Sequence, residues 1–387
     1  MSNSELVALL EKRPDLLANV ESKYKYESGA NGACKIDTAL LESACRKAEH
    51  TTDFGNAERL VFQHGRDLHY CRELGWLVWD GRRWAKDETG EVCRRAKDTV
   101  RKIYAEAAME ASESKRKELA SWAKQSEAEH RIRAMVKLAE TEEGIPISVD
   151  MLDTNPWPLN CRNGTIDLRT GNLRPHQRED LISKLAPVNY DPEAVCPRFL
   201  EFLAEIFHSV VPGATGRLID YMHRAIGYSV TGVTTEQVLH LFYGTGSNGK
   251  STFLEILRDM LGDYASQADF TTFLAGKNDA IRNDVARLAG ARFVAAVEAE
   301  SGRRLSEVLV KSLTGGDTIT ARFLHREFFE FKPQMKIFLA VNHKPIIRGT
   351  DYGIWRRIRL IPFTVTFPPD KRDRRLIEKW SLNFRAY

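Results

Sequence analysis

One feature restricts the possible folds of this chain more than any other. It is a glycine-rich turn that ends in lysine and lies between an apolar stretch and an amphipathic one. The stretch FYGTGSNGKSTF, residues 242–253, fits the spacing G-x-x-x-x-G-K-[ST]. Before it, QVLHLFYG has the composition of a buried parallel strand, and after it STFLEILRDMLG places apolar residues on one helical face. Strand, glycine loop and helix in this order predict an α/β fold with a phosphate-binding loop; a purely structural glycine turn is the alternative.

The chemistry of such a loop assigns roles to its residues. Backbone N–H groups surround the phosphates, the lysine reaches the outer phosphates, and the hydroxyl after it holds Mg²⁺. We therefore predict that the loop binds ATP and Mg²⁺, with Lys250 on the phosphates and Ser251 on the metal. The predicted nucleotide-binding residues are Gly244, Thr245, Gly246, Ser247, Asn248, Gly249, Lys250, Ser251 and Thr252.

Two acids follow a second apolar stretch, ARFVAAVEAE at residues 291–300. Hydrolysis at a phosphate loop requires acids at the end of a neighbouring buried strand, to position Mg²⁺ and to orient water. Glu298 ends the stretch, and Glu300 faces the same side if the strand continues. We assign Glu298 to the magnesium ion and Glu300 to the water, although the two roles could be exchanged. Two solvent-facing carboxylates are the alternative.

Further candidates lie nearer the C-terminus. MKIFLAVN, residues 335–342, is a third apolar strand that ends in Asn342, which is predicted to sense the γ-phosphate; a simple turn former is the alternative. GIWRRIRLIPF places Arg356 and Arg357 before another apolar strand. Either arginine would serve as a finger on the γ-phosphate of a neighbouring subunit, or both would only solvate a surface.

A projecting hairpin is predicted between the acids and Asn342. TITARFL and FFEFKPQM are β-prone and flank the polar tip His325-Arg326-Glu327. Basic side chains that contact phosphates, beside rings that stack on bases, are the mixture used for unspecific binding of single-stranded DNA. An exposed hairpin whose basic residues only keep it soluble is the alternative. The DNA-binding candidates are Lys311, Arg322, His325, Arg326 and Lys332, with Phe328 as a second stacking ring.

The residues before the loop predict a separate α+β region. A helix is expected near 58–65, a hairpin at Asp80-Gly81, and another hairpin at residues 170–172. Residues 91–141 lack Gly and Pro and predict long helices, whose mixed charges indicate solvated faces or, as the alternative, a rail along nucleic acid. Helices are also expected at 191–207 and 216–230. The predicted organisation is a linker at 1–50 and domains at 51–195 and 196–387.

Composition sets limits on the other function classes. The net charge of +4 permits a polyanionic partner without requiring one. The six cysteines form no C-x-x-C pair and no cluster at zinc spacing, so neither disulfides nor a metal clip is expected. No apolar run approaches the roughly 20 residues that cross a bilayer, and we expect a cytoplasmic protein with no membrane partner.

The ordered set GTGSNGKST, RFVAAVEAESGRR, FLAVNHKP and WRRIRLIPF resembles the superfamily 3 helicase domain of phage and plasmid primase-helicases, relatives of the poxvirus primase-helicase. The region from FGNAERLVFQHG to YDPEAVCPRFLEF is similar to the accessory domain that precedes that helicase. The resemblance implies an AAA+-like core with a parallel sheet behind an α+β domain. It also implies a homo-hexameric ring, 3′ to 5′ travel on single-stranded DNA, and a phage or prophage gene in a bacterial host.

These motifs predict an ATP-driven DNA helicase acting on single-stranded and forked DNA. The first 50 residues are too short, and too poor in acids and cysteines, for a primase module, so a separate primase is a possible partner. Two rivals remain open. One is an ATP-switched DNA-binding or origin-loading protein that does not unwind, and the other is a P-loop kinase acting on a small substrate.

Overall fold

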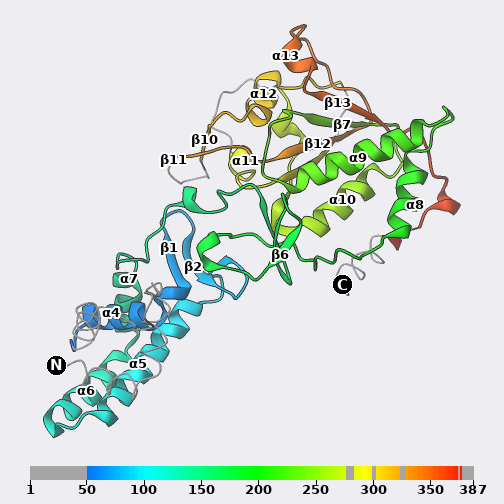
Figure 1. The fold of residues 1–387 in the computed structure, drawn as a ribbon. Coiled ribbons are helices and arrows are strands. Elements are labelled where there is room, and N and C mark those ends of the chain that lie inside the picture. Colours follow the sequence, from blue (N-terminus) through cyan, green and yellow to red (C-terminus); the bar gives the residue numbers. More distant parts are fainter. Residues whose placement is uncertain (1–49, 276–282, 299–301, 323–327, 374, 377–387) are drawn as a thin grey trace, which may run out of the picture. The chain divides into compact units, whose positions relative to one another are not determined.

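The computed structural model describes residues 50–275, 283–298, 302–322, 328–373 and 375–376. These residues form two compact units, the first made of 50–80 with 84–151 and the second of 81–83 with 152–376. Figure 1 shows the elements of each unit in sequence colours.

The first unit combines four helices with a small antiparallel sheet. The helices are α4 (Asp53–His64), α5 (Glu91–Met109), α6 (Glu113–Ser126) and α7 (Glu129–Ala139). The sheet has the order β1 (Leu68–Cys71), β2 (Gly75–Trp79) and β3 (Trp84–Lys86). Because β2 and β3 pair antiparallel with Trp79 opposite Trp84, the hairpin predicted at Asp80-Gly81 is confirmed. The long helices predicted over 91–141 are confirmed as α5, α6 and α7.

Small apolar residues bring these helices close together, and one buried amide fastens them. Ala57, Ala96 and Ala139 are fully buried in a shared core. Asn56 on α4 accepts a hydrogen bond from Trp122 Nε1 at 2.9 Å. Its own Nδ2 donates to Ser126 Oγ at 3.0 Å. The buried polar group is therefore paired on both sides, which removes the cost of desolvating it.

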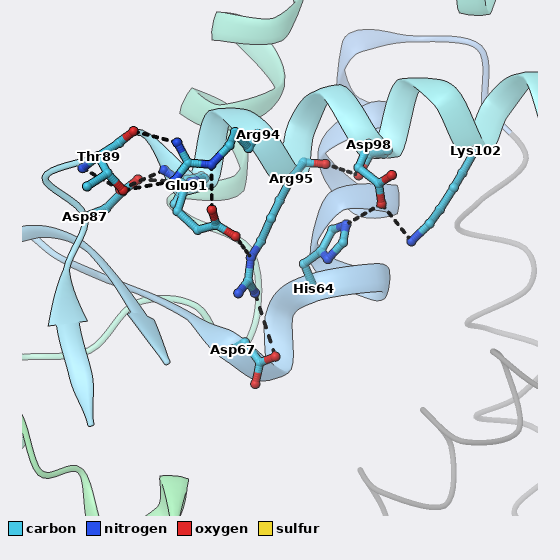
Figure 2. A network of polar contacts seen from close by, with 11 residues as sticks. His64, Asp67, Asp87, Thr89, Glu91, Arg94, Arg95, Asp98 and Lys102 are labelled. Atoms are coloured by element: carbon cyan, nitrogen blue, oxygen red, sulfur yellow. Dashed lines mark hydrogen bonds and ion pairs between the residues drawn. The ribbon is translucent and has the colours of Figure 1, made fainter. Parts of the chain in front are cut away.

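The charges along α5 pair with one another and with Asp67, which follows α4 (Figure 2). The pairs are Glu91 with Arg94 and Arg95, Asp98 with Lys102, and Arg95 with Asp67. His64 Nε2 lies 3.7 Å from Asp98 Oδ2, but burial lowers the pKa of His64 to about 4, so this ring adds no charge near neutral pH. Each acid on the first turns of α5 therefore neutralises at least one of the basic residues beside it. This pattern is typical of solvated helical faces, and the alternative, an acid-and-base rail that touches nucleic acid, stays a prediction.

The second unit begins with an antiparallel sheet and two helices. The sheet has the order β4 (Pro158–Cys161), β5 (Gly164–Asp167) and β6 (Asn172–Arg174), which confirms the hairpin predicted at 170–172. The helices α8 (Pro197–Ile206) and α9 (Ala214–Val230) follow, and both were predicted. Pro197 stands in the first turn of α8, where its missing N–H costs no hydrogen bond.

A five-stranded parallel sheet forms the centre of the second unit. Its order is β13 (Ile358–Pro362), β7 (Leu239–Tyr243), β12 (Lys336–Val341), β9 (Phe293–Val297) and β8 (Ala265–Gln267). All its pairings are parallel. The predicted α/β class is thereby confirmed: an AAA+-like parallel sheet, preceded along the chain by an α+β region.

Successive residues of each strand face opposite sides of this sheet, so helices cover both faces (Figure 1). Phe242 and Phe338 face a core shared with α8, α9 and α10 (Lys250–Leu261). Leu241 and Leu339 face a second core. The second core is shared with α11 (Asn283–Ala286), α12 (Glu307–Gly315) and α13 (Tyr352–Trp355).

The hairpin predicted after α12 is confirmed in its two arms. The strands β10 (Ile319–Arg322) and β11 (Phe328–Phe331) pair antiparallel, with Arg322 opposite Phe328. The tip, residues 323–327, lies outside the described residues.

The division between the two compact units falls at residues 151 and 152, upstream of the predicted boundary at 195. The physical reason is that β4 and β5 share a core with the parallel sheet, through Leu159, Cys161 and Ile166. The domain limits 51–195 and 196–387 stay a prediction. Along the described part of the chain, no helix is both long and apolar enough to span a bilayer.

Candidate functional site

The predicted phosphate loop connects β7 to α10 and depends on two crowded glycines. Gly249 caps α10 with φ +86°, and a Cβ there would lie 2.5 Å from Ile206 Cγ2 on α8. A Cβ on Gly244 would lie 2.3 Å from the carbonyl oxygen of Phe363. Only glycine fits either position, because any side chain would collide with atoms that are themselves packed. The loop is therefore held against α8 on one side and against the end of β13 on the other.

The amine of Lys250 is buried at the centre of this loop. Lys250 is 6% exposed, and its Nζ donates to Gly244 O at 2.5 Å, to Asn248 Oδ1 at 3.1 Å and to Asn342 Oδ1 at 3.4 Å. All three acceptors are neutral oxygens. Burial lowers the pKa of Lys250 below its usual value, and the Glu298 carboxylate opposes that shift. No anion among the described residues bonds to this amine, so it is suited to receive a phosphate in a glycine loop.

Glu298 follows β9 and faces the end of β12. It is 9% exposed, and its Oε2 accepts the backbone N–H of Asn342 at 2.8 Å and that of His343 at 3.1 Å. Since β12 lies between β7 and β9, Asn342 contacts Lys250 through its side chain and Glu298 through its backbone. The three predicted residues Lys250, Asn342 and Glu298 therefore meet at the carboxyl edge of three adjacent strands.

The donors at this edge fit the chemistry of Mg²⁺. That ion takes one or two protein oxygens and completes its shell with phosphate and water. Ser251 is exposed in the first turn of α10, and Glu298 Oε1 makes no hydrogen bond to any described residue. These two side chains would hold the ion. Glu300, the predicted partner of Glu298, lies outside the described residues.

The two arginines predicted as finger candidates lie at the opposite edge of the sheet. Ile358 pairs with Leu239, so the residues before it stand at the amino ends of the strands, about 16 Å from the loop edge for a five-residue strand. Arg357 is 8% exposed and donates to Thr314 Oγ1 at 3.1 Å and to Gly353 O at 2.6 Å. Burial lowers its pKa. Such a side chain acts as an internal clamp, which leaves Arg356 as the one of the pair nearer the surface.

The predicted DNA-contacting residues do not form one set. Lys311 lies on α12, and its Nζ donates to both carboxylate oxygens of Asp351 at 3.0 Å, which lowers the pKa of that carboxyl. Its charge is therefore already neutralised. Arg322 and Lys332 are exposed on and beside the hairpin, and the Arg322 guanidinium lies 5.1 Å from the ring of Phe328. His325 and Arg326 lie outside the described residues.

Two features of the site were not predicted. The side-chain amide of Asn248 is buried and bonds on both sides, to Lys250 and to Phe363. Lys344, two residues past Asn342, lies with its Nζ 5.0 Å from the ring of Tyr243, which directly precedes the loop. The sequence gives no signal for either contact, because each depends on which strands are neighbours.

Fold and site together define an α/β protein of the P-loop class. Residues 57–208 match the family described as D5 N terminal like. Residues 242–357 match the family of unknown function DUF5906. The first match lies ahead of the loop and the second contains it, along with Glu298 and Asn342.

Several proteins of large DNA viruses are similar to this chain. "Putative helicase L207/L206" of Acanthamoeba polyphaga mimivirus is 25% identical over 353 residues, covering 86% of this chain and 36% of that protein. "Putative helicase 022R" of Frog virus 3 is 26% identical over 282 residues, covering 56% and 29%. "Putative primase C962R" of African swine fever virus is 27% identical over 251 residues, covering 61% and 26%. The chain thus spans about a third or less of each relative.

Among solved structures, the A form apo structure of the NrS-1 C terminal region is similar over 66% of this chain and 57% of that chain, with 13% identity and a TM-score of 0.39. At this TM-score the likeness is distant and assigns no residue. The two family matches and the names of the viral relatives agree with the resemblance to primase-helicases on which the motifs were interpreted.

Proposed function

We propose that the chain is an ATP-dependent DNA helicase of viral or phage replication, which hydrolyses ATP to move along DNA and unwind it. The observation that carries this proposal is the meeting of Lys250, Asn342 and Glu298 at the carboxyl edge of β7, β12 and β9. In open α/β sheets, ligands bind outside the carboxyl ends of the strands. The names of the viral relatives, helicases and primases, support the same proposal.

The chemistry assigned to the site is positioning and electrostatics. Lys250 would exchange its neutral acceptors for phosphate oxygens, because a hydrogen bond between two charged groups is roughly twice as strong as a neutral one. Bound Mg²⁺ would supply charge neutralisation between the phosphates. Glu298, already fixed by two backbone N–H groups, would orient the ion or the attacking water. Asn342 would report the state of the γ-phosphate to β12.

A complete hydrolysis site would take an arginine from a second subunit, and we propose that the subunits form a homo-hexamer. Arg356 lies about 16 Å from the loop of its own chain, so it would reach a γ-phosphate only across a subunit junction. The exposed hairpin residues Arg322 and Lys332 would contact single-stranded DNA, with Phe328 stacking on a base. We further propose that the protein acts in the cytoplasm of a bacterial host, as a phage or prophage product.

The test measures phosphate release with and without single-stranded DNA. Lys250→Ala should abolish release, since no other described cation lies within the loop. Arg322→Ala with Lys332→Ala should keep basal release and lose the stimulation by DNA. Lys97→Ala with Arg101→Ala removes the same charge from the exposed face of α5 and should behave as the wild type.

Strand displacement on forked DNA separates the helicase from its rivals. Displacement that requires both ATP and Lys250 supports the proposal. Binding and slow hydrolysis without displacement would instead assign an ATP-switched DNA-binding or loading role. A phosphorylated small product would assign a kinase. Phosphate release that survives Lys250→Ala would refute the nucleotide site itself.

A further inference from the structure

The side chain of Asn248 joins the phosphate loop to the end of β13. Asn248 is 3% exposed, its Oδ1 accepts from Lys250 Nζ at 3.1 Å, and its Nδ2 donates to Phe363 O at 3.3 Å. The orientation of the amide follows from its partners, since an ammonium group only donates and a carbonyl only accepts. Neither bond survives a flip of the amide. One buried side chain is therefore shared between the lysine and a backbone carbonyl 115 residues away in sequence.

The chain after β13 is attached to the loop at a second point. Phe367 donates its backbone N–H to Ser247 O at 2.8 Å. Phe363 is 2% exposed, with its ring 5.0 Å from that of Phe207 and 4.9 Å from that of Phe242. We call residues 363–367 the C-terminal strap. The strap touches the loop at residues 247 and 248 and is anchored in the core at its first residue.

A phosphate would compete with Asn248 for the hydrogen bond that the Lys250 amine donates. The three acceptors of this amine in the loop are neutral, and a phosphate oxygen competes with them as a charged acceptor. The lysine has three N–H donors, and the Asn248 oxygen loses its donor if that N–H is the one that turns to a phosphate. The amide then keeps only its bond to the strap, and a side chain held at one end is freer to reorient.

We propose that Asn248 is a positioning residue that holds the Lys250 amine in the nucleotide-free loop and transmits nucleotide binding to the C-terminal strap. The inference rests on the proposed nucleotide site and adds to it a route from the phosphates to the chain beyond β13. It predicts that nucleotide binding raises hydrogen exchange in the strap and lowers hydrogen exchange in the loop. If Asn248 only stabilised the loop, nucleotide binding would lower hydrogen exchange in both the loop and the strap.

Two substitutions at this position should change nucleotide affinity in opposite directions. Asn248→Asp gives Lys250 a charged acceptor and places an anion near the phosphates, so the affinity for Mg²⁺ with ATPγS should fall by about tenfold or more. Asn248→Ala removes a competitor for the lysine, so the affinity should stay equal or rise. A structural role would weaken binding in both variants. Isothermal titration calorimetry on the full chain measures this difference.

Hydrogen exchange on the wild type tests the strap without any variant. Deuterium uptake of a peptide spanning 363–367 should rise on adding Mg²⁺ with ATPγS, while uptake of the loop peptide falls. In Asn248→Ala the strap should exchange fast with or without the nucleotide. Thr364→Ala, an exposed change within the strap, is the matched control and should keep the wild-type response.

The outcomes separate the two proposals. If the wild type binds ATPγS but strap uptake falls or stays constant, the inference is wrong and the nucleotide site stands. The same conclusion follows if Asn248→Asp and Asn248→Ala weaken binding alike. If the wild type does not bind ATPγS at all, the proposed function fails and the inference fails with it.

Discussion

Replacing Gly249 by alanine tests whether the loop is shaped by its contact with α8. Gly249 has φ +86°, and an added Cβ would lie 2.5 Å from Cγ2 of Ile206, a distance that real Cβ atoms do not adopt. Ile206 is fully buried, so it has little room to move away. The substitution therefore combines two costs, a left-handed backbone carrying a side chain and an overpacked contact.

The magnitude follows from adding those two costs. An L-residue in the left-handed region costs about 1–2 kcal/mol. Overpacking a well-filled core costs about 1–3 kcal/mol. Gly249→Ala should therefore lower the free energy of unfolding by about 2–5 kcal/mol. Gly246 is the matched control because it also has a positive φ, +104°, but an added Cβ there meets no atom within 4 Å. Gly246→Ala should show the backbone cost alone.

The assay is urea unfolding of the full chain, with hydrogen exchange in α10 to report on the second unit specifically. Combining Gly249→Ala with Ile206→Ala removes the crowding methyl group, so the double-mutant cycle should give a favourable coupling of about 1–3 kcal/mol. Equal costs for the two glycine substitutions, or additivity within about 0.5 kcal/mol, would refute the steric reasoning.

Three further predictions follow from single contacts. Glu298→Gln should keep nucleotide binding, because a glutamine oxygen still accepts both backbone N–H groups, and should slow Mg²⁺-dependent phosphate release at least about a hundredfold. Lys311→Ala should change the free energy of unfolding by less than about 1 kcal/mol, because its pair with Asp351 is partly exposed, and should leave DNA affinity in fluorescence anisotropy unchanged. Burial, aided by the charge of Lys102, lowers the pKa of His64 to about 4. The unfolded chain takes up that proton near pH 6.5, so the free energy of unfolding should fall between pH 6.5 and 4, and His64→Gln should flatten this slope.

The local parts of the site could be predicted because the residues of each part lie close together in the sequence. Gly244, Gly249 and Lys250 lie within seven residues, and the strand and helix on either side have clear periodicities. Glu298 and Asn342 each end an apolar run, and parallel strands bring such ends to one edge. The same reasoning found the hairpin arms β10 and β11, since alternation and turn residues are local signals.

The contacts that the sequence did not predict depend on partners far away in sequence. Lys311 was predicted to contact DNA, and the structure pairs it with Asp351, 40 residues later, so its contact with DNA stays a prediction. Arg357 follows an equally charged neighbour, and only the packing of α12 and α13 makes it buried while Arg356 stays partly exposed. A sequence shows which residues are charged, but it does not show which charges meet. The tertiary fold decides which charged side chains pair, and no periodicity in the sequence predicts those pairs.

The order of the strands explains why the lysine is the focus of the site. The loop strand β7 has β12 on one side and β13 on the other. The residue after β12, Asn342, reaches the Lys250 amine directly, and the residue after β13, Phe363, reaches it through Asn248. Through its backbone N–H, Asn342 also holds the acid that follows β9. A change at the amine would therefore act on the residues that follow both neighbouring strands, and this is the property that the proposed nucleotide-driven motor needs from a rigid sheet.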